Sequence, residues 1–441
     1  MYVTEIFAQY ALRQRARPLP PSVLHHAKRA AIDWYASVFP GFETQPVRLL
    51  MDVVSEDLDR GAARLAPGRV ATARAAALVN GAAAHAAEVD DSFRDAMYHP
   101  GAATIAAALA AAQSCGADGL RFLRGLVMGY EVSTRIGVVM GREHYKYWHN
   151  TGTVGTFGAA AAAAEILQLD AGAFAHALAT AATFAAGLQQ AFRMDSMSKP
   201  LHPGRAAEGG LLAAQLAGRG ATGSLDILEG EAGFGRALGT GPDWSRVGET
   251  LGSDFHITRL TFKNHIGCGH TFPAIDAALA LQRQHGIAAA DIEHVHVATY
   301  GPALDIACYM QPTTANESRF SIPYVVATAL VHGSVRMDAY EPPRLQDPRT
   351  RALLQRVSAV VDPQIDAAFP GQRAARVEIT LRDGRRLAHF QPNRKGDPEE
   401  PLDDAELEGK LLELAAPVIG TEAARALLAR VWTLETQASV P

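Results

Sequence analysis

The chain has 441 residues, of which 48% are hydrophobic and 20% charged, and its formal net charge is -5. This composition is typical of a globular protein with a large core, and the length favours two domains over one. The acidic balance gives no reason to expect nucleic acid or an anionic membrane as a partner. Three cysteines are too few for a disulfide framework or a zinc site.

Neither a membrane span nor a signal peptide is predicted. No apolar run approaches the roughly 20 residues that cross a bilayer, because Gly, His and Arg interrupt the alanine-rich stretches. The first residues, MYVTEIFAQYALRQR, lack the basic and then apolar order of a signal peptide. We therefore expect a cytoplasmic protein.

Residues 22–255 are predicted to form helix after helix, because apolar residues recur at helical spacing. Asp118 and Asp170 are predicted to cap two of these helices at their N-termini. The helices are rich in alanine and apolar on most faces. This predicts a buried bundle in which helices approach closely.

The pattern changes near His256. The segment ITRLTFKNHIGCG that follows predicts a strand and then a turn, and the last segment, 399–435, predicts helices. Between them the sequence predicts a helix at 271–286, a half-buried strand at 292–300, a helix at 319–333 and an Asp-Gly hairpin at 375–391. The predicted fold is therefore mostly α. It has a large helical domain formed by residues 1–260 and 396–441, and a smaller α+β domain at 261–395.

Lysine is rare in this chain. Of 41 basic residues only six are lysines, and Lys199 and Lys263 lie in segments dense in His and Gly. An amine can lose its proton, whereas a guanidinium cannot, so these two lysines are candidates for proton chemistry. Codon usage that depletes lysine throughout the chain explains the count equally well.

The segment HAAEVDDSFRDAMYHPG at 85–101 is predicted to be a loop between two apolar helices. A histidine directly before so apolar a helix points into the protein, near the positive end of the helix dipole. Solvated helix caps are the alternative explanation for the acids. The candidate residues of this loop are Glu88, Asp90, Asp91, Ser92, Asp95 and His99.

Two further segments place cationic or titratable groups before apolar helices. In YKYWHNTGTVGTFG, His149 precedes a helix whose free N–H groups suit a carboxylate. The alternative is a core histidine that is hydrogen-bonded to a carbonyl, which would give the same sequence pattern. In SKPLHPGR, the groups Lys199, His202 and Arg205 predict an anion site or, alternatively, a solvated basic loop.

The segment KNHIGCGHTF at 263–272 holds Lys263, His265, Cys268 and His270, but its spacing matches no zinc pattern, so no metal is predicted. No serine-nucleophile elbow, P-loop or cofactor motif occurs either, and GTVGTFG is not a dinucleotide fingerprint. Chemistry without a cofactor, on an anionic substrate, points to proton abstraction next to a carboxylate.

These segments, in this order, resemble the MmgE/PrpD family, which includes 2-methylcitrate dehydratase, cis-aconitate decarboxylase and iminodisuccinate epimerase. The resemblance covers nearly the whole chain, from HAAEVDDSFRDAMYHPGAA to RFSIPYVVATAL. It implies a helical domain built from both ends of the chain, an inserted α+β lid, a homodimer, and an active site in the cleft between the domains. It also implies that neither a metal nor an organic cofactor is needed.

Carried over residue by residue, the resemblance implies catalytic roles for His99, His149, Lys199, Lys263 and Asp90. We expect substrate binding by Glu88, Asp91, Ser92, Tyr145, His202, His265, Cys268 and Tyr324. The chain departs from the family's pattern at Glu88, where aspartate is usual, and by one extra residue before His99. It also has His265-Ile266 in place of an aromatic residue and proline, and Phe272 in the position of the last histidine of the lid motif.

We therefore expect an enzyme that removes a proton alpha to a carboxylate of a small di- or tricarboxylate. His149 or Lys263 is the expected base, with His99 as a partner acid. A dehydratase of the 2-methylcitrate or citrate type is the first expectation. The alternatives are an epimerase of an iminodisuccinate-like acid, a cis-aconitate-type decarboxylase and, outside the enzymes, a catalytically silent metabolite-binding relative.

Overall fold

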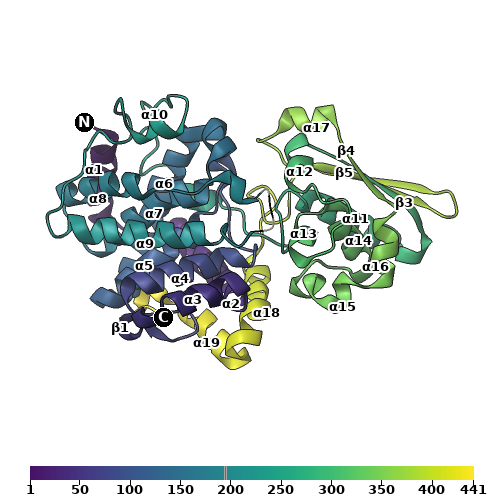
Figure 1. Cartoon of the computed structure of the whole chain (residues 1–441), viewed down its shortest axis with the longest axis horizontal. Coiled ribbons are helices and arrows are strands. Elements are labelled where there is room, and N and C mark those ends of the chain that lie inside the picture. The colour runs from purple at the N-terminus through teal and green to yellow at the C-terminus, as the bar shows by residue number, and fades with distance from the viewer. Residues whose placement is uncertain (193, 195) are drawn as a thin grey trace. The chain divides into compact units, whose positions relative to one another are not determined.

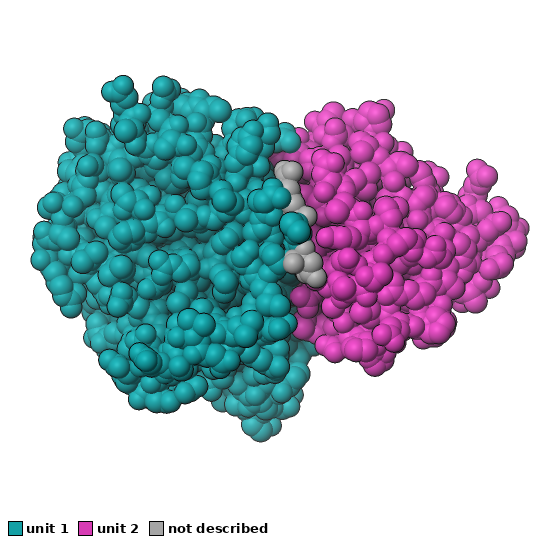
Figure 2. Space-filling model, viewed as in Figure 1, with its two compact units in different colours: residues 1–262, 403–441 teal, residues 263–402 magenta. Residues whose placement is uncertain are grey.

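The computed structural model of the chain describes residues 1–192, 194 and 196–441. They form two compact units, one made of Met1–Phe262 with Asp403–Pro441 and the other of Lys263–Leu402 (Figure 2). Helices dominate, and the strands form only a two-stranded and a four-stranded sheet. The predicted mostly α fold class with a small α+β region is confirmed.

The first unit is a bundle of helices drawn from both ends of the sequence (Figure 1). The C-terminal helix α18 packs on α2, and α19 packs on α18. The helices of this unit are α1 (Val3–Arg15), α2 (Pro21–Phe42), α3 (Gln45–Val53), α4 (Ala73–Ala86), α5 (Pro100–Cys115), α6 (Gly119–Tyr147), α7 (Asn150–Ile166), α8 (Ala171–Phe184), α9 (Leu201–Ala217), α10 (Phe234–Leu238), α18 (Asp404–Ile419) and α19 (Thr421–Trp432).

Helix α7 is the centre of this bundle. All its residues are buried, and it packs against α5, α6, α8 and α9. Small side chains allow this packing. A Cβ at Gly158 would lie 2.5 Å from Thr104 Oγ1, and one at Gly210 would lie 2.6 Å from the carbonyl oxygen of Thr156. The alanine and glycine content therefore lets neighbouring helices meet almost at backbone distance.

Two predicted caps are confirmed. Asp118 accepts a hydrogen bond from the backbone N–H of Arg121, and Asp170 accepts one from that of Ala173. The helices α5 and α7 begin differently, because His99 and His149 stand at their N-cap positions without a side-chain cap bond. Both imidazoles are therefore available for other contacts.

The prediction of one helix after another over 22–255 is wrong in two places. Strands β1 (Leu58–Arg64) and β2 (Val70–Ala71) form a small antiparallel hairpin, and residues 218–255 are mostly turns apart from α10. In the first place Asp59 and Gly61 have φ angles of 60° and 92°, which no right-handed helix accommodates. In the second, glycines recur too often for a helix to continue.

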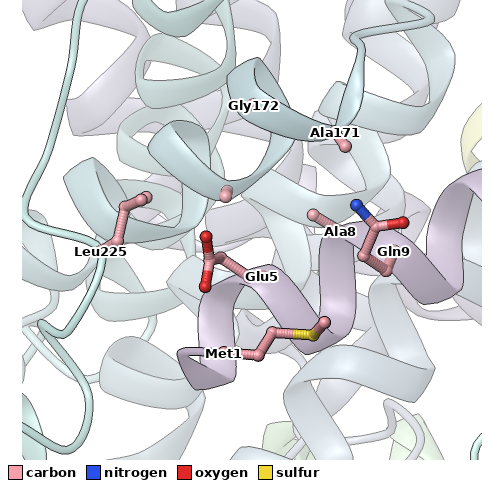
Figure 3. A pocket seen from close by; sticks show the side chains of 8 residues that line it. Met1, Glu5, Ala8, Gln9, Ala171, Gly172 and Leu225 are labelled. Carbon is pink, nitrogen blue, oxygen red and sulfur yellow. The ribbon is translucent and has the colours of Figure 1, made fainter.

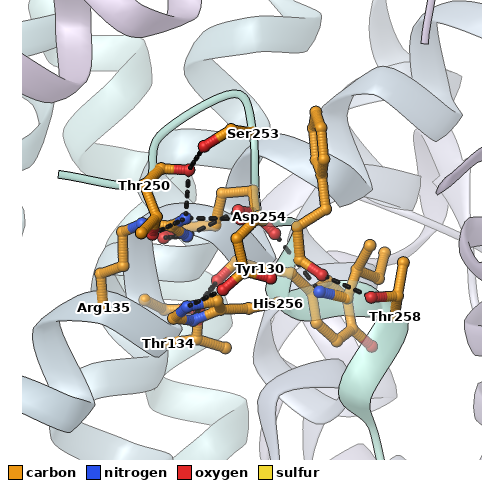
Figure 4. Close-up of polar contacts among 12 residues, drawn as sticks. Tyr130, Thr134, Arg135, Thr250, Ser253, Asp254, His256 and Thr258 are labelled. Atoms are coloured by element: carbon orange, nitrogen blue, oxygen red, sulfur yellow. Dashed lines mark hydrogen bonds and ion pairs between the residues drawn. The ribbon is translucent and has the colours of Figure 1, made fainter. Parts of the chain in front are cut away.

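The predicted strand after His256 is also wrong. Its first backbone donor, the N–H of Ile257, binds Glu131 Oε1 in α6 at 3.3 Å instead of a neighbouring strand. The residues just before it also bind α6, as Figure 4 shows. His256 Nδ1 lies 2.9 Å from Thr134 Oγ1, and Arg135 donates to the carbonyl oxygen of Asp254 at 2.7 Å. Residues His256–Arg259 form a 3-10 turn, and Thr261 then makes a single β-bridge.

The second unit contains a four-stranded sheet in the order β4-β3-β5-β6. β3 pairs with β4 in parallel, whereas the pairs β3–β5 and β5–β6 are antiparallel. The Asp-Gly hairpin is therefore confirmed, and helix α11 packs on its two strands. The elements of this unit are α11 (Phe272–His285), β3 (Ile292–Thr299), α12 (Gly301–Ile306), α13 (Ala315–Arg319), α14 (Ile322–His332), α15 (Pro342–Leu345), α16 (Pro348–Leu354), β4 (Val357–Val361), α17 (Pro363–Ala368), β5 (Ala375–Leu381) and β6 (Arg386–Gln391).

Within the described part of the chain, no helix combines the length and the apolar character that a membrane crossing requires.

Candidate active site

Three helices of the first unit, α5, α7 and α9, begin at the same place. The backbone N–H of His99, before α5, donates to Thr151 Oγ1 in the first turn of α7 at 3.2 Å. His149, before α7, has its Nδ1 3.0 Å from Nδ1 of His202 in the first turn of α9. Helix N-termini carry partial positive charge and unbonded N–H groups. Their convergence suits an anionic ligand.

His85, in the last turn of α4, lies among the predicted histidines, although the sequence analysis did not single it out. Its Nδ1 is 2.7 Å from Asp90 Oδ2, and both side chains are buried. Its ring centroid is 4.9 Å from that of His99 and 5.4 Å from that of His149. The sequence could have indicated His85 by its position five residues before Asp90, in a segment already predicted to contribute to the site.

The imidazole of His99 is held by the acid-rich loop between α4 and α5, called the acidic loop below. Its Nδ1 is 2.6 Å from the carbonyl oxygen of Asp91, which can only accept, so Nδ1 carries a proton. The carboxylate of Asp90 is also close, at 3.5 Å from the same nitrogen. A second proton on this ring would therefore be favoured by a nearby negative charge.

Asp91 is turned away from these rings and organises the loop. Its Oδ1 accepts the backbone N–H of Gly101 at 3.0 Å, and its Oδ2 accepts the Tyr130 hydroxyl at 2.7 Å. Burial, reinforced by the charge of Asp33, raises the pKa of Asp91 to about 8. Its predicted substrate contact stays a prediction, and the geometry favours a positioning role.

Lys199 and Glu88 form an ion pair in which both side chains are largely buried. Glu88 has a φ of 59°, a left-handed conformation that a residue other than glycine rarely adopts. Strain of this kind persists where surrounding contacts hold the residue in place. Here the pair with Lys199 does so, and the ammonium also lies 5.1 Å from the centroid of the Phe192 ring.

The two paired histidines are uncharged at neutral pH. Burial, followed by the charges of His85 and Lys199, lowers the pKa of His202 from 6.5 to about 4. The same causes lower the pKa of His149 well below 6.5. Two neutral rings joined through Nδ1 share one proton on that line. One ring therefore donates Nδ1–H and keeps a lone pair on Nε2, whereas the other accepts at Nδ1 and carries its proton on Nε2.

The remaining predicted residues of the first unit lie at different distances from this cluster. Ser92 forms a β-bridge with Thr261, so the acidic loop is tied to the segment that precedes the second unit. Tyr145 is half-buried near the end of α6, and its role stays a prediction. Arg205 is exposed and pairs with Glu208, so the anion site expected from Lys199, His202 and Arg205 loses its third member.

The other four predicted residues belong to the second unit, and Lys263 and Cys268 are buried there. His265 Nε2 is 2.7 Å from Asp276 Oδ1, and the backbone N–H of Cys268 donates to the carbonyl oxygen of Arg319. The hydroxyl of Tyr324 donates to the carbonyl oxygen of Ala339. The roles of these four at a substrate site stay predictions.

His85, Asp90 and His99 lie close enough to resemble a metal site, with one ligand atom from each within 4.8 Å of the others. The Nδ1 atoms of the two histidines are not free for a metal, however. Nδ1 of His85 faces Asp90, and Nδ1 of His99 donates to the carbonyl oxygen of Asp91. A protonated nitrogen has no lone pair to give a cation. The arrangement fits hydrogen bonding better than metal ligation.

A separate hollow of about 370 Å³ lies between α1 and α8 (Figure 3). Its lining residues are mostly small or apolar, and Glu5 is the acidic side chain among them. It contains none of the predicted site residues and offers no acid–base pair.

The sequence of the chain is similar to those of known proteins. The MmgE/PrpD N-terminal domain model matches residues 5–247, and the C-terminal domain model matches residues 265–436. The chain is 28% identical to the cis-aconitate decarboxylase-like protein oryM of Aspergillus oryzae, over 99% of this chain and 95% of that protein. It is 27% identical to human cis-aconitate decarboxylase, over 98% and 92% respectively. The 2-methylcitrate dehydratase of Escherichia coli is 31% identical over 37% of this chain and 38% of its own length.

Proposed function

The chain belongs to the MmgE/PrpD family, and on this basis we propose that it is a lyase acting on a small di- or tricarboxylate by proton transfer at the carbon next to a carboxylate. The relatives named as decarboxylases and as a dehydratase support a lyase at the level of the family. The single observation that carries the proposal is the meeting of neutral His149 and His202 with the Lys199–Glu88 pair at three helix N-termini.

The binding half of the proposal rests on charge. A carboxylate placed at the start of α5, α7 and α9 would meet partial positive charge and the ammonium of Lys199. Lys199 already pairs with Glu88, so a substrate carboxylate must share the ammonium or displace the glutamate. Removing a proton beside a carboxylate adds negative charge, and donors already in place offset that cost.

The chemical half rests on two histidines that enter from different helices. In a dehydration the base takes a proton from carbon, the β-hydroxyl leaves with a proton from the acid, and water and an alkene result. His149 is uncharged and suits the base, whereas His99 lies beside Asp90 and suits the acid. We therefore propose dehydration of a citrate-type or 2-methylcitrate-type acid first.

Decarboxylation of a cis-aconitate-type acid is the second candidate, favoured by the relatives that match over almost the whole chain. In that reaction the bond to one carboxylate carbon breaks, carbon dioxide leaves, and a histidine delivers one proton to the remaining carbon framework. Epimerisation of an iminodisuccinate-like acid needs the same base and acid on opposite faces. Homodimer assembly and a cytoplasmic location stay predictions.

The proposal is tested by incubating the purified protein in deuterium oxide with citrate, 2-methylcitrate, cis-aconitate and an aminodicarboxylate, each followed by proton NMR. Dehydration gives a vinyl proton signal from citrate and the signal of a methyl group on a double bond from 2-methylcitrate. Decarboxylation gives a product with one carbon fewer, and epimerisation gives deuterium on carbon without loss of a group. His149→Ala should abolish the activity that is found. A protein that binds one of these acids, but exchanges and converts none, would be a silent metabolite-binding relative.

A further inference from the structure

We propose that His85 and Asp90 form a buried proton relay between the predicted base His149 and the predicted acid His99. This assigns a function to a histidine that neither the sequence analysis nor the comparisons single out. The inference deepens the proposed function and rests on it, because a relay needs an acid and a base to serve. Four observations carry it.

First, the hydrogen bond to Asp90 defines the tautomer of His85. Nδ1 of His85 is 2.7 Å from a carboxylate oxygen, so Nδ1–H donates and a neutral ring keeps its lone pair on Nε2. The side chains of His85 and Asp90 are 0% and 2% exposed, so water does not compete for this bond. An aspartate behind a histidine in this way fixes the tautomer and stabilises the imidazolium when it forms.

Second, the lone pair of His85 is not used elsewhere. Nε2 is buried and makes no hydrogen bond to the residues that the structure describes. A buried ring nitrogen without a partner is costly to the folded protein, and such atoms in native structures call for a functional explanation. A proton acceptor that is filled only during turnover is such an explanation.

Third, the neighbours of His85 are the two rings between which a proton must move. The ring centroids of His99 and His149 lie 4.9 Å and 5.4 Å from that of His85. His99 and His149 stand on different helices, whereas His85 comes from α4 and lies next to both. The relay therefore requires ring rotations that bring Nε2 within reach of each neighbour in turn.

Fourth, the protons balance over one dehydration. His149 takes a proton from the substrate carbon, and His99 gives a proton to the leaving hydroxyl, which departs as water. His149 then passes its proton to Nε2 of His85, whose imidazolium faces the Asp90 carboxylate, and His85 passes a proton on to His99. All three histidines end as they began, and the cluster exchanges no proton with bulk solvent. His85 acts through its neighbours and is therefore a positioning and relay residue.

The dyad is tested without any substrate by NMR of protein carrying ¹⁵N-labelled histidine rings. We expect one histidine with Nδ1 protonated and Nε2 unprotonated, whose signals vanish in His85→Asn and whose Nδ1–H signal moves in Asp90→Asn. The asparagine amide still donates to Asp90, so His85→Asn should fold, and His85→Gln is the second variant if it does not. A proton on Nε2 of His85 in the resting protein would overturn the proposal.

The relay itself is tested on whichever acid the wild-type protein converts. His85→Asn should lower kcat by about 100-fold, at the lower end of what general acid–base groups contribute, while KM changes by no more than about twofold. The matched control is His25→Asn, because His25 also faces an aspartate, Asp404 at 3.3 Å, but lies outside the cluster. The control should leave kcat unchanged.

Two results would contradict the relay, and one would separate it from the proposed function. A kcat within about threefold of wild type in His85→Asn would contradict it. So would loss of activity on dialysis against a chelator with recovery on adding zinc, because His85 would then be a ligand. If the wild-type protein converted none of the acids, the proposed function and the relay would fail together, whereas NMR would still decide the dyad.

Discussion

The predicted site residues fall in two regions of the molecule, and the two regions use them differently. In the first unit His99, His149 and Lys199 contact other polar side chains that were predicted for the site or belong to the same cluster. In the second unit His265 binds Asp276, and Tyr324 binds a backbone carbonyl, so each supports the fold of its own unit.

This difference shows what a buried polar residue can be used for. A side chain whose polar atoms all bind main-chain groups or a fixed partner holds shape, and its removal costs stability. A side chain that faces other titratable groups can exchange protons with them, and its removal costs rate. This difference between the two regions can be tested with variants whose stability and turnover rate are measured separately.

The largest effect is expected at Lys199. Lys199→Met should lower kcat/KM by about 1000-fold, because it removes a charge from the place where negative charge develops. It also removes the ammonium that pairs with the largely buried Glu88, so the free energy of unfolding should fall too. Steady-state kinetics and urea unfolding measure the two effects.

The matched control for Lys199 is Lys28→Met. Lys28 also pairs with a glutamate, Glu435 at 2.8 Å, and also has a largely buried side chain. This variant should lose some stability and keep its kinetic constants. If Lys199→Met lost no more activity than Lys28→Met, the ion pair in the first unit would be structural, and the contrast between the two regions would disappear.

A smaller effect, on stability instead of rate, is expected at Tyr324. Tyr324→Phe leaves the carbonyl oxygen of Ala339 without its donor, which should cost about 1–3 kcal/mol in the free energy of unfolding. We expect kcat to stay within about threefold of wild type, because the hydroxyl is used inside its own unit. Thermal or urea unfolding and one kinetic assay decide the point.

Tyr340→Phe serves as the comparison, since its hydroxyl also donates to a carbonyl oxygen, that of Ile266 at 2.5 Å. The two variants should lose similar stability. A large loss of kcat in Tyr324→Phe alone, with stability retained, would show that Tyr324 reaches the substrate, as the family resemblance implied. The contrast drawn here would then be wrong for that residue.

The smallest effect is expected in the pH dependence of stability. Histidines in an unfolded chain bind protons below about pH 6.5, whereas folded His202 and His256, whose pKa values burial lowers to about 4 and 3, do not. Stability should therefore fall as the pH drops from 6.5 to 4. The contribution of Asp91 to the pH dependence of stability has the opposite sign. Its folded carboxyl keeps a proton up to about pH 8, whereas an unfolded aspartate loses it near pH 4, so Asp91 lowers the stability as the pH rises through this whole interval. Above pH 6.5, where the two histidines no longer oppose it, stability should fall up to about pH 8.

Urea unfolding across this range should show a maximum near pH 6.5, with a slope above it of at most about 1.4 kcal/mol per pH unit. Asp91→Asn should flatten the slope on the alkaline side and steepen the rise on the acidic side, where Asp91 opposes the two histidines. An alkaline slope that survives in Asp91→Asn would show that another group causes it. Glu131, whose pKa burial raises to about 7, would then be the next candidate.

Much of this architecture was readable from sequence because it depends on local patterns. Alanine at helical spacing, the caps Asp118 and Asp170 and the Asp-Gly hairpin each report on neighbours within a few residues. The strand expected after His256 failed because Ile257 and Thr261 in that segment bind Glu131 and Ser92, which lie far away in the sequence. Local pattern cannot report such partners.

The same limit applies to the site. Sequence marked His99, His149 and Lys199 because each stands before an apolar helix, and the family resemblance marked them again. His85 stands near the end of a helix, where a histidine is ordinary, and only its bond to Asp90 and its two neighbouring rings distinguish it. The opposite orientations of Asp90 and Asp91 were likewise not predictable, because adjacent residues share one sequence context.

Lys410 in α18 shows that the first unit, which is built from two separate parts of the sequence, depends on a helix that is synthesised late. Its ammonium binds Asp33 Oδ1 at 2.6 Å and the carbonyl oxygen of Val89 at 2.8 Å, 321 residues away in the sequence. On the ribosome, therefore, the acidic loop and the carboxylate of Asp33 must wait for the synthesis of α18 before they gain this partner. All residues of the second unit are made before α18, so we expect this unit to mature first during translation and the histidine cluster to be completed afterwards.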